Sequence, residues 1–323
     1  MANRILFTAI IFLSLISCTN KEKMTMVGST GRINHLLIVM NNNEWQGEIG
    51  DALRNIIAEP LEGLPQEEAQ FSVNQVTPKA FTTLFKPTRN ILFVGFDEKK
   101  NFYSNKDVYA SPQVTLTILG KDKEELIRNI NDHKEEIINT FKTRDLALYQ
   151  QKITAKTWKN KNLETFNNSG FSLKIPMTYS KVEDDGDFLW FRYRFTKGQL
   201  NILTYTVPLD SDVDFNVENI IKIRDSIGKK HIPGQFENTH MITEPQYEPA
   251  TKMITLDGKD AIETRGLWIV KNDYMGGPFV NYAIHDEAND RMIILEGFSY
   301  SPATNKRDFV FEMEAILKTF RMN

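Results

Sequence analysis

The sequence has a single cysteine, Cys18, among its 323 residues. A disulfide needs two thiols, so this chain closes none within itself. Acylation of the Cys18 thiol, predicted below, would also exclude cysteine catalysis and metal–thiolate sites. A chain of about 300 residues can bury enough apolar surface to fold without such cross-links. The scarcity of cysteine therefore argues against a disulfide scaffold.

An excess of charge of one sign is also absent. The chain carries 39 Lys and Arg against 42 Asp and Glu, a formal net charge of −3. Loss of Arg4 with a signal peptide would leave 38 basic residues, and 38 − 42 = −4. Neither sign gathers in one segment, which argues against a nucleic-acid-binding surface. We expect no nucleic-acid partner.

The motifs of common catalytic and cofactor sites are missing. The chain has no Gly-x-Ser-x-Gly, no P-loop and no Gly-x-Gly-x-x-Gly. No two histidines stand four residues apart, as a zinc-binding helix would require; they are His35, His133, His231, His240 and His285. We therefore predict no metal and no cofactor, and we assign no catalytic residue. Catalytic sets are often assembled from distant positions, so an enzyme is not excluded.

The chain begins with the pattern of a secretion signal. Arg4 precedes the mostly apolar segment Ile5–Ile16, whose twelve residues would span roughly 18 Å as a helix. A membrane core of about 30 Å is too thick for it. The tetrapeptide Leu15-Ile16-Ser17-Cys18 has the form of a lipobox. We predict that residues 1–17 are a signal peptide and that Cys18 receives diacylglycerol and an N-acyl group such as palmitate. The alternative is a short anchor helix beside an incidental cysteine.

Two lipid attachments are enough for stable anchoring. We therefore expect a lipoprotein of the bacterial cell envelope, lipid-anchored on the outer membrane and facing the periplasm, with the membrane as its first partner. The charged segment Lys21-Glu22-Lys23 fits poorly with acidic signals for export to the outer face, although the membrane side stays open. A further partner would be an unknown envelope protein or a small ligand.

Composition divides the mature chain into three parts. Residues 18–32 are polar and are expected to be a lipidated tether. Residues 33–161 alternate apolar strands with helical patterns, which predicts an α/β domain. Strands are expected near 34–40, 71–76, 90–96 and 113–119, and helices near 44–58, 78–85 and from 122 beyond 148.

Residues 162–323 carry the pattern of antiparallel strands. The pair Asp257-Gly258 between two apolar runs is a strong hairpin signal. Helices are expected at 216–227 and 305–320. The predicted fold class is thus α+β, with two α/β sandwich-type domains, the second having a mainly antiparallel sheet of about six strands and two helices. The pattern Ile-x-x-Thr-Phe-basic at 137–142 and 316–321 leaves a domain duplication open.

One strand is a candidate binding face. Its period-two pattern places four side chains on the face opposite the ordinary core set; they are Phe188, Trp190, Arg192 and Arg194. Aromatic residues and arginine are enriched at interfaces. A helix packed over this face, with arginine stems covering it, would give the same pattern.

A second candidate is the segment Met275-Gly276-Gly277-Pro278. Paired glycines permit positive φ, and a proline can begin the following strand, so we expect a tight turn. The alternative is close approach of a ligand to Gly276 and Gly277. The set that a hydrolase could use is limited to Glu263, His285, Asp286 and Glu296.

Several phrases resemble the Bacteroidetes lipoprotein family called domain of unknown function 4837, over nearly the whole mature chain. They are Asn43–Gly47, Gly50–Arg54, Glu59–Gln66, Phe85-Lys86, Arg89–Ile91, Arg265–Trp268, Met275–Phe279 and Glu296–Phe298. The resemblance implies an envelope lipoprotein and no particular activity. Phe171–Pro176 and Leu317–Phe320 also make the second domain faintly similar to the PsbP/Mog1/DcrB-like sandwiches, which act mostly as binding or assembly modules.

Together these features predict a membrane-anchored envelope lipoprotein that is a non-enzymatic binding or assembly module. The alternative is an envelope hydrolase that acts on glycan or lipid. It would need a cleft where carboxylates or a histidine converge with perturbed pKa values.

Overall fold

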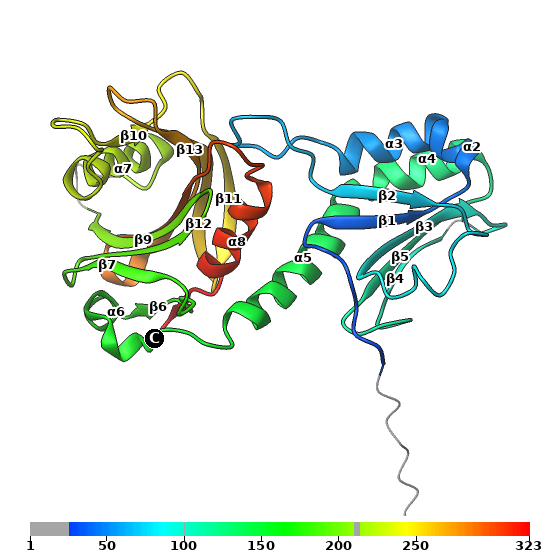
Figure 1. Cartoon of the computed structure of the whole chain (residues 1–323), viewed down its shortest axis with the longest axis horizontal. Coiled ribbons are helices and arrows are strands. Elements are labelled where there is room, and N and C mark those ends of the chain that lie inside the picture. The colour runs from blue at the N-terminus through cyan, green and yellow to red at the C-terminus, as the bar shows by residue number, and fades with distance from the viewer. Residues whose placement is uncertain (1–25, 100, 210–213) are drawn as a thin grey trace, which may run out of the picture.

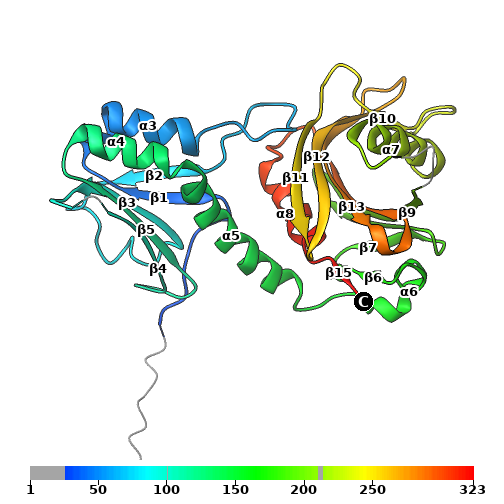
Figure 2. The same ribbon diagram turned by 180° about the vertical axis from the view of Figure 1, so that it is seen from behind.

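The structure is a computed structural model that describes residues 26–99, 101–209 and 214–323. The predicted signal peptide and Cys18 lie outside the described residues. Two sheets with their own helices form two domains, joined by the helix α5 (Lys134–Ile153) and by the loop 58–71 (Figures 1 and 2). Within the described ranges, every helix is too short or too polar to cross a membrane.

The N-terminal domain is a five-stranded sheet with helices. Its strands are β1 (His35–Val39), β2 (Ser72–Val76), β3 (Asn90–Phe96), β4 (Asn101–Lys106) and β5 (Val114–Gly120). Its helices are α2 (Asn42–Gln46), α3 (Glu48–Ile57), α4 (Lys123–Asp132) and the first part of α5. The order is β2-β1-β3-β5-β4, parallel except for β4 on β5. Strands β1, β3 and β5 are nearly continuous apolar runs because both faces of a parallel sheet are covered.

The sequence predictions for this domain are confirmed in outline and differ in four places. The helix predicted at 44–58 is divided at Gly47 into α2 and α3. Strand β4 was not predicted, because it is a polar, mostly exposed edge strand without hydrophobic alternation. Residues 78–85 form turns and no helix. The long helix predicted from residue 122 is divided at His133 into α4 and α5, and its predicted cap is present, since Asp122 accepts the Glu125 N–H at 2.8 Å.

The end of the expected tether is part of this domain. The Ser111 N–H donates to the Val27 carbonyl at 2.9 Å, and the Thr30 N–H donates to Pro87 at 2.8 Å. The Arg89 N–H returns a bond to Thr30 at 2.8 Å. The prediction of a free linker up to residue 32 is therefore wrong for the end of that segment, which the structure describes from residue 26.

The C-terminal domain is built on an eight-stranded antiparallel sheet. Its strands are β7 (Ser180–Asp184), β8 (Phe188–Phe195), β9 (Gly198–Pro208), β10 (Met241–Thr243), β11 (Ala250–Leu256), β12 (Lys259–Val270), β13 (Gly276–Asp286) and β14 (Arg291–Tyr300). The order is β10-β12-β13-β14-β9-β8-β7, with β11 also paired to β12. A small separate sheet joins β6 (Phe171–Ser172) to β15 (Arg321–Met322). The helices are α6 (Glu164–Ser169), α7 (Val217–His231) and α8 (Arg307–Leu317), with single turns η2 (Asn160–Asn162) and η3 (Glu287–Asn289).

The mainly antiparallel α+β fold agrees with the prediction, and the sheet is larger than expected because the short strands β7 and β10 join its edges. Helix α7 packs on one face and α8 on the other, each over its own hydrophobic core. The parallel and antiparallel sheets have different topologies, so the similar segments at 137–142 and 316–321 do not mark a duplication. The first lies within α5, whereas the second runs past the end of α8.

The domains meet through contacts from both sides. Leu64, in the loop 58–71, belongs to the core cluster of the C-terminal domain. The carboxylate of Glu68 accepts the N–H groups of Lys306 and Arg307 at 2.6 and 3.1 Å, at the start of α8. Gln150 of α5 donates to the Ala315 carbonyl of α8 at 3.0 Å. These contacts give the two domains one packed junction.

Candidate functional site

A cleft of about 600 Å³ lies at this junction. Its walls come from α5 and the loop 58–71 on one side and from β11, β12 and α8 on the other. The apolar lining includes Leu61, Ile138, Leu146, Ile254 and Phe311. The charged lining comprises Glu59, Glu62, Lys134, Glu135, Lys142, Lys252, Glu263, Arg265, Glu314 and Lys318. The cleft thus combines hydrocarbon surface with many ionisable groups.

An ion-pair network forms the floor of the cleft. Arg265 on β12 donates from Nε to Glu263 at 2.8 Å and from Nη2 to Glu314 of α8. Glu314 also accepts from the Tyr282 hydroxyl and from Lys318 Nζ, each at 3.2 Å. The alternation of β12 places Glu263 and Arg265 on the same face, which is the face that α8 covers.

The two carboxylates of this network are held in the ionised form. Burial alone would raise the pKa of Glu314, but the charges of Arg265, Lys318 and Lys142 lower it to about 2. Burial alone would also raise the pKa of Glu263, but the charge and hydrogen bond of Arg265 lower it. Neither carboxylate is therefore a proton donor near neutral pH.

Lys142 of α5 lies in the same cleft without a carboxylate partner. Its ammonium group donates to the Gln70 side-chain oxygen and lies 5.9 Å from the centre of the Phe71 ring. Among the described residues no acidic side chain lies within 4.0 Å of it. Burial is the main reason that the pKa of Lys142 falls to about 8, with Arg265, Lys318 and Arg307 adding to it and Glu314 opposing it.

Arg265 also has an unused donor. Its Nη1 is buried and has no hydrogen-bond partner among the residues that the structure describes. Buried guanidinium N–H groups are normally paired, so an unpaired one indicates a place for an acceptor. In the sequence, Arg265 stands out only as part of a family phrase. Lys142 does not stand out, because a lysine on a helix is usually exposed to solvent.

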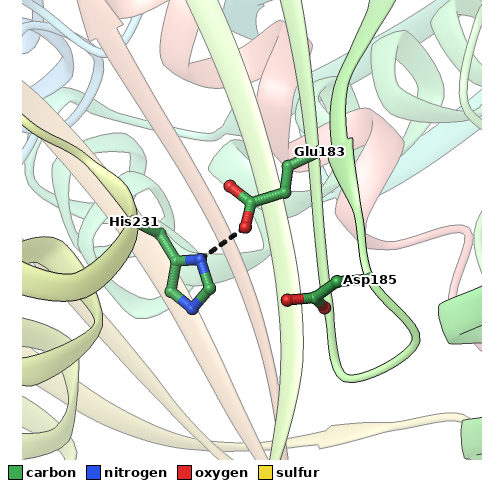
Figure 3. Close-up of side chains that lie close together, drawn as sticks. All are labelled: Glu183, Asp185 and His231. Carbon is green, nitrogen blue, oxygen red and sulfur yellow. Dashed lines mark hydrogen bonds and ion pairs between the residues drawn. The ribbon is translucent and has the colours of Figure 1, made fainter.

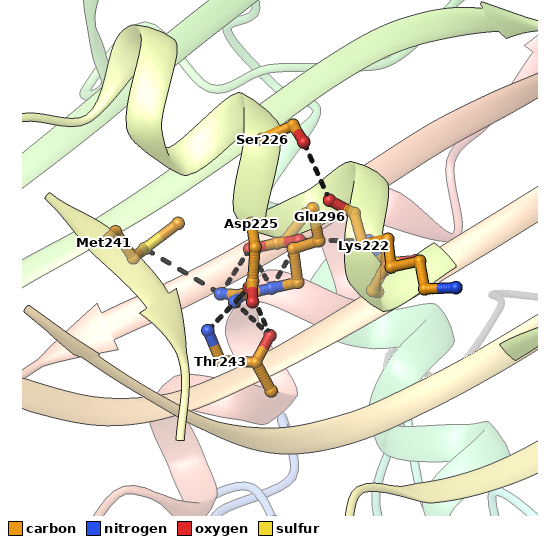
Figure 4. Close-up of polar contacts among 8 residues, drawn as sticks. Lys222, Asp225, Ser226, Met241, Thr243 and Glu296 are labelled. Carbon is orange, nitrogen blue, oxygen red and sulfur yellow. Dashed lines mark hydrogen bonds and ion pairs between the residues drawn. The ribbon is translucent and has the colours of Figure 1, made fainter. Parts of the chain in front are cut away.

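A second buried charge pair joins Arg224 of α7 to Glu296 of β14, and Figure 4 shows Glu296 among neighbouring polar residues. Arg224 and Glu296 are 2% and 0% exposed, and the guanidinium contacts the carboxylate at 3.0 to 3.1 Å. Thr243 accepts from Arg224 at 2.9 Å, Asn281 donates to Glu296 at 3.0 Å, and Phe279 lies 3.9 Å below the guanidinium. All of this is enclosed, so we interpret the pair as structural.

Three potential metal ligands also meet near the end of α7: Glu183, Asp185 and His231, with ligand atoms within 4.8 Å of one another (Figure 3). His231 Nδ1 already hydrogen-bonds Glu183 at 2.7 Å, and its ring stacks on Phe188. Asp185 accepts the Phe188 N–H at 2.8 Å and thereby closes the β7–β8 turn. These contacts explain the cluster without an ion, and we assign no metal to it.

The predicted binding face is partly covered. Phe188 and Trp190 are 2% and 6% exposed and belong to the core beneath α7. Arg192 lies 4.4 Å over the Trp190 ring and donates to Asn201 at 3.1 Å. Only Arg194 is exposed. Phe188 and Trp190 are therefore packed in the core, as the packing alternative expects.

The predicted glycine turn is instead the start of β13. A Cβ on Gly277 would lie 2.1 Å from the Ser299 carbonyl oxygen, and one on Gly276 would lie 2.8 Å from that of Trp268. Neither residue has a positive φ. These glycines allow neighbouring strands to approach closely, and the reversal itself lies before them, at residues 271–275.

The residues proposed for a hydrolase do not meet. Glu263 pairs across the sheet with Tyr282, whereas Glu296 pairs with Asn281, so the two carboxylates point to opposite faces. Asp286 is buried against Lys259 and Arg291, at 3.1 and 2.8 Å. Burial alone would raise the pKa of Asp286, but the hydrogen bond from Arg291 and the other contacts lower it.

Comparison with known proteins gives family matches without an activity. The model described as Domain of unknown function (DUF4837) matches residues 156–319, and Domain of unknown function (DUF8532) matches residues 29–154. The resemblance noted between residues 43 and 91 therefore falls within the second match. No curated protein matches the chain.

Several solved structures are similar to about half of the chain. The Ran-binding protein Mog1p of Saccharomyces cerevisiae shares 8% identity, with 47% of this chain and 90% of that chain covered and a TM-score of 0.32. LpqN of Mycobacterium tuberculosis, described as involved in cell envelope biogenesis, shares 11% identity over 46% and 79%, with a TM-score of 0.28. A Bacteroides thetaiotaomicron protein shares 11% over 48% and 46%, with a TM-score of 0.26.

Proposed function

This chain belongs to the family described as Domain of unknown function (DUF4837), and we propose that it is a non-enzymatic binding module of the bacterial envelope whose ligand site is the cleft between its two domains. The observation that carries the proposal is the pairing of unused cationic donors with an apolar wall in this cleft. Clefts at domain interfaces that combine apolar side chains with convergent polar groups are common ligand sites.

The ionisation of the cleft favours binding over catalysis. Glu263 and Glu314 are both paired with Arg265, and their pKa values are lowered. A general acid needs the opposite change, a pKa raised toward the working pH. The carboxylates instead fix the guanidinium and the Lys318 ammonium in place, as preorganised binding groups require.

We further propose that the module is held on the outer membrane, facing the periplasm, by diacylglycerol and an N-acyl group on Cys18. The apolar segment Ile5–Ile16 and the lipobox support this. Cells fed radiolabelled palmitate should label the wild-type protein and leave Cys18→Ser unlabelled and longer by the uncleaved signal. Labelling of the variant would contradict the anchor.

The cleft itself can be tested with two adjacent positions on β11. Lys252 lines the cleft, and its exposed neighbour Met253 does not. The photoreactive residue p-benzoylphenylalanine replaces each in turn in the full chain, and cells are irradiated before purification and mass spectrometry. We expect a covalent adduct of defined mass from position 252 and none from position 253. Absence of an adduct at 252, or equal adducts at both positions, would refute the proposed site.

A further inference from the structure

The donors in the cleft identify the chemical class of the ligand. Three cations, Lys142, Arg265 and Lys318, lie around two carboxylates, Glu263 and Glu314. With every group ionised, the interior holds 3 − 2 = 1 uncompensated positive charge. The other charged lining residues pair at the rim, as Lys134 does with Glu59 at 3.0 Å, or are exposed to solvent.

The three cations are only partly exposed to solvent. A buried cation without a counter-ion is costly unless an anion pairs with it. Gln70 can accept only from one of the three N–H bonds of Lys142, and it is neutral. No protein group in the described part of the chain accepts a hydrogen bond from Arg265 Nη1. An anionic group bound between them would satisfy both donors at once.

The rest of the cleft is suited to hydrocarbon. Ile138 and Phe311, which are 8% and 6% exposed, line the cleft together with Leu146 and Ile254. These apolar residues come from both domains. A hydrocarbon chain bound in the cleft would therefore contact apolar side chains on two sides. Burial of each CH2 group contributes about 0.8 kcal/mol.

We propose that the cleft binds an amphiphilic anion, with one carboxylate or phosphate held by Lys142 and Arg265 and a hydrocarbon portion along Ile138, Leu146, Ile254 and Phe311. This inference rests on the proposed function and specifies its ligand. The two headgroups share the same chemistry, since both present several acceptor oxygens to a guanidinium and an ammonium.

The test uses the full chain in lipid nanodiscs and equilibrium dialysis of radiolabelled probes, with empty nanodiscs subtracted. The probes are octanoate, octyl phosphate, acetate and octylammonium. We expect octanoate or octyl phosphate to bind, and whichever binds more tightly identifies the headgroup. Acetate should bind at least tenfold more weakly, because it lacks the chain, and octylammonium should not bind. Equal binding of octylammonium would overturn the proposal.

Matched variants separate the site from its surroundings. Lys142→Met keeps the apolar stem and should weaken octanoate binding at least tenfold. Lys152→Met, on the same helix but outside the lining of the cleft, should leave it unchanged. Loss in both variants, or in neither, would refute the role of Lys142.

A pH series gives an independent measurement. The groups that act on the pKa of Lys142 are Glu314 and Lys318 of α8, Arg265 of β12, and Arg307. Lys142 must be protonated to pair with an anion, so wild-type affinity should fall as pH rises above about 8. In Lys142→Met the affinity should be independent of pH across this range. A neutral or cationic adduct at position 252 would refute the ligand class while leaving the proposed function standing.

Discussion

Removing Arg224 should destabilise the C-terminal domain more than almost any other single change. The guanidinium is the main partner of Glu296, and without it the carboxylate keeps only the Asn281 donor in a dry core. Breaking a buried pair from one side costs about 3–5 kcal/mol, because the remaining charge is left uncompensated. For a domain of this size about 2–4 °C is lost per kcal/mol, so Arg224→Met should lower Tm by about 6–20 °C.

The assays are thermal unfolding for Tm and urea unfolding for the free energy. Both are followed by tryptophan fluorescence, since Trp190 and Trp268 lie in the same core. The double variant Arg224→Met/Glu296→Leu replaces both charges with apolar groups. Such replacements are often neutral or stabilising, so the double variant should recover most of the loss. The reasoning is wrong if Arg224→Met costs under about 1 kcal/mol, or if the two single losses simply add.

Three further outcomes are expected. Glu68→Gln weakens the cap on α8, so it should cost about 0.5–2 kcal/mol and separate the melting of the two domains in calorimetry; its exposed neighbour Glu67→Gln should change neither. The folded-state pKa of Glu314 is lowered, so its stabilisation is complete above about 4.5 and lost as pH falls toward about 2; Glu314→Gln should remove that part of the acid dependence of unfolding. Gly277→Ala should cost about 1–3 kcal/mol in thermal unfolding because its Cβ meets the Ser299 carbonyl, whereas Gly95→Ala meets nothing and serves as its control.

Strong periodic patterns predicted the fold well. The apolar runs of β1, β3 and β5 and the Asp257-Gly258 hairpin are local signals, and the structure contains each of them. The missed strands have weak local signals. Strand β4 is polar because it lies at an edge, and β10 is only three residues long. Their pairing depends on partners elsewhere in the chain, which periodicity does not describe.

The cleft could not be predicted in the same way. Arg265 and Glu314 lie far apart in the sequence, and only the packing of α8 against β12 brings them together. Lys142 looks like an ordinary basic residue on α5 until the second domain covers it. At Phe188 and Trp190 the pattern itself was ambiguous, because buried aromatic residues and binding aromatic residues have the same spacing.

The position of Leu64 has a consequence for the biosynthesis of the protein. Leu64 precedes the C-terminal domain in the chain, yet it packs with Ala261 of β12, Val280 of β13 and Val310 of α8 in one core. A growing chain emerges from its N-terminus and domains tend to fold in that order. The loop 58–71 must therefore wait with an exposed leucine until translation reaches α8. A stall in elongation between the two domains would therefore leave Leu64 exposed, and exposed apolar side chains of this kind favour aggregation.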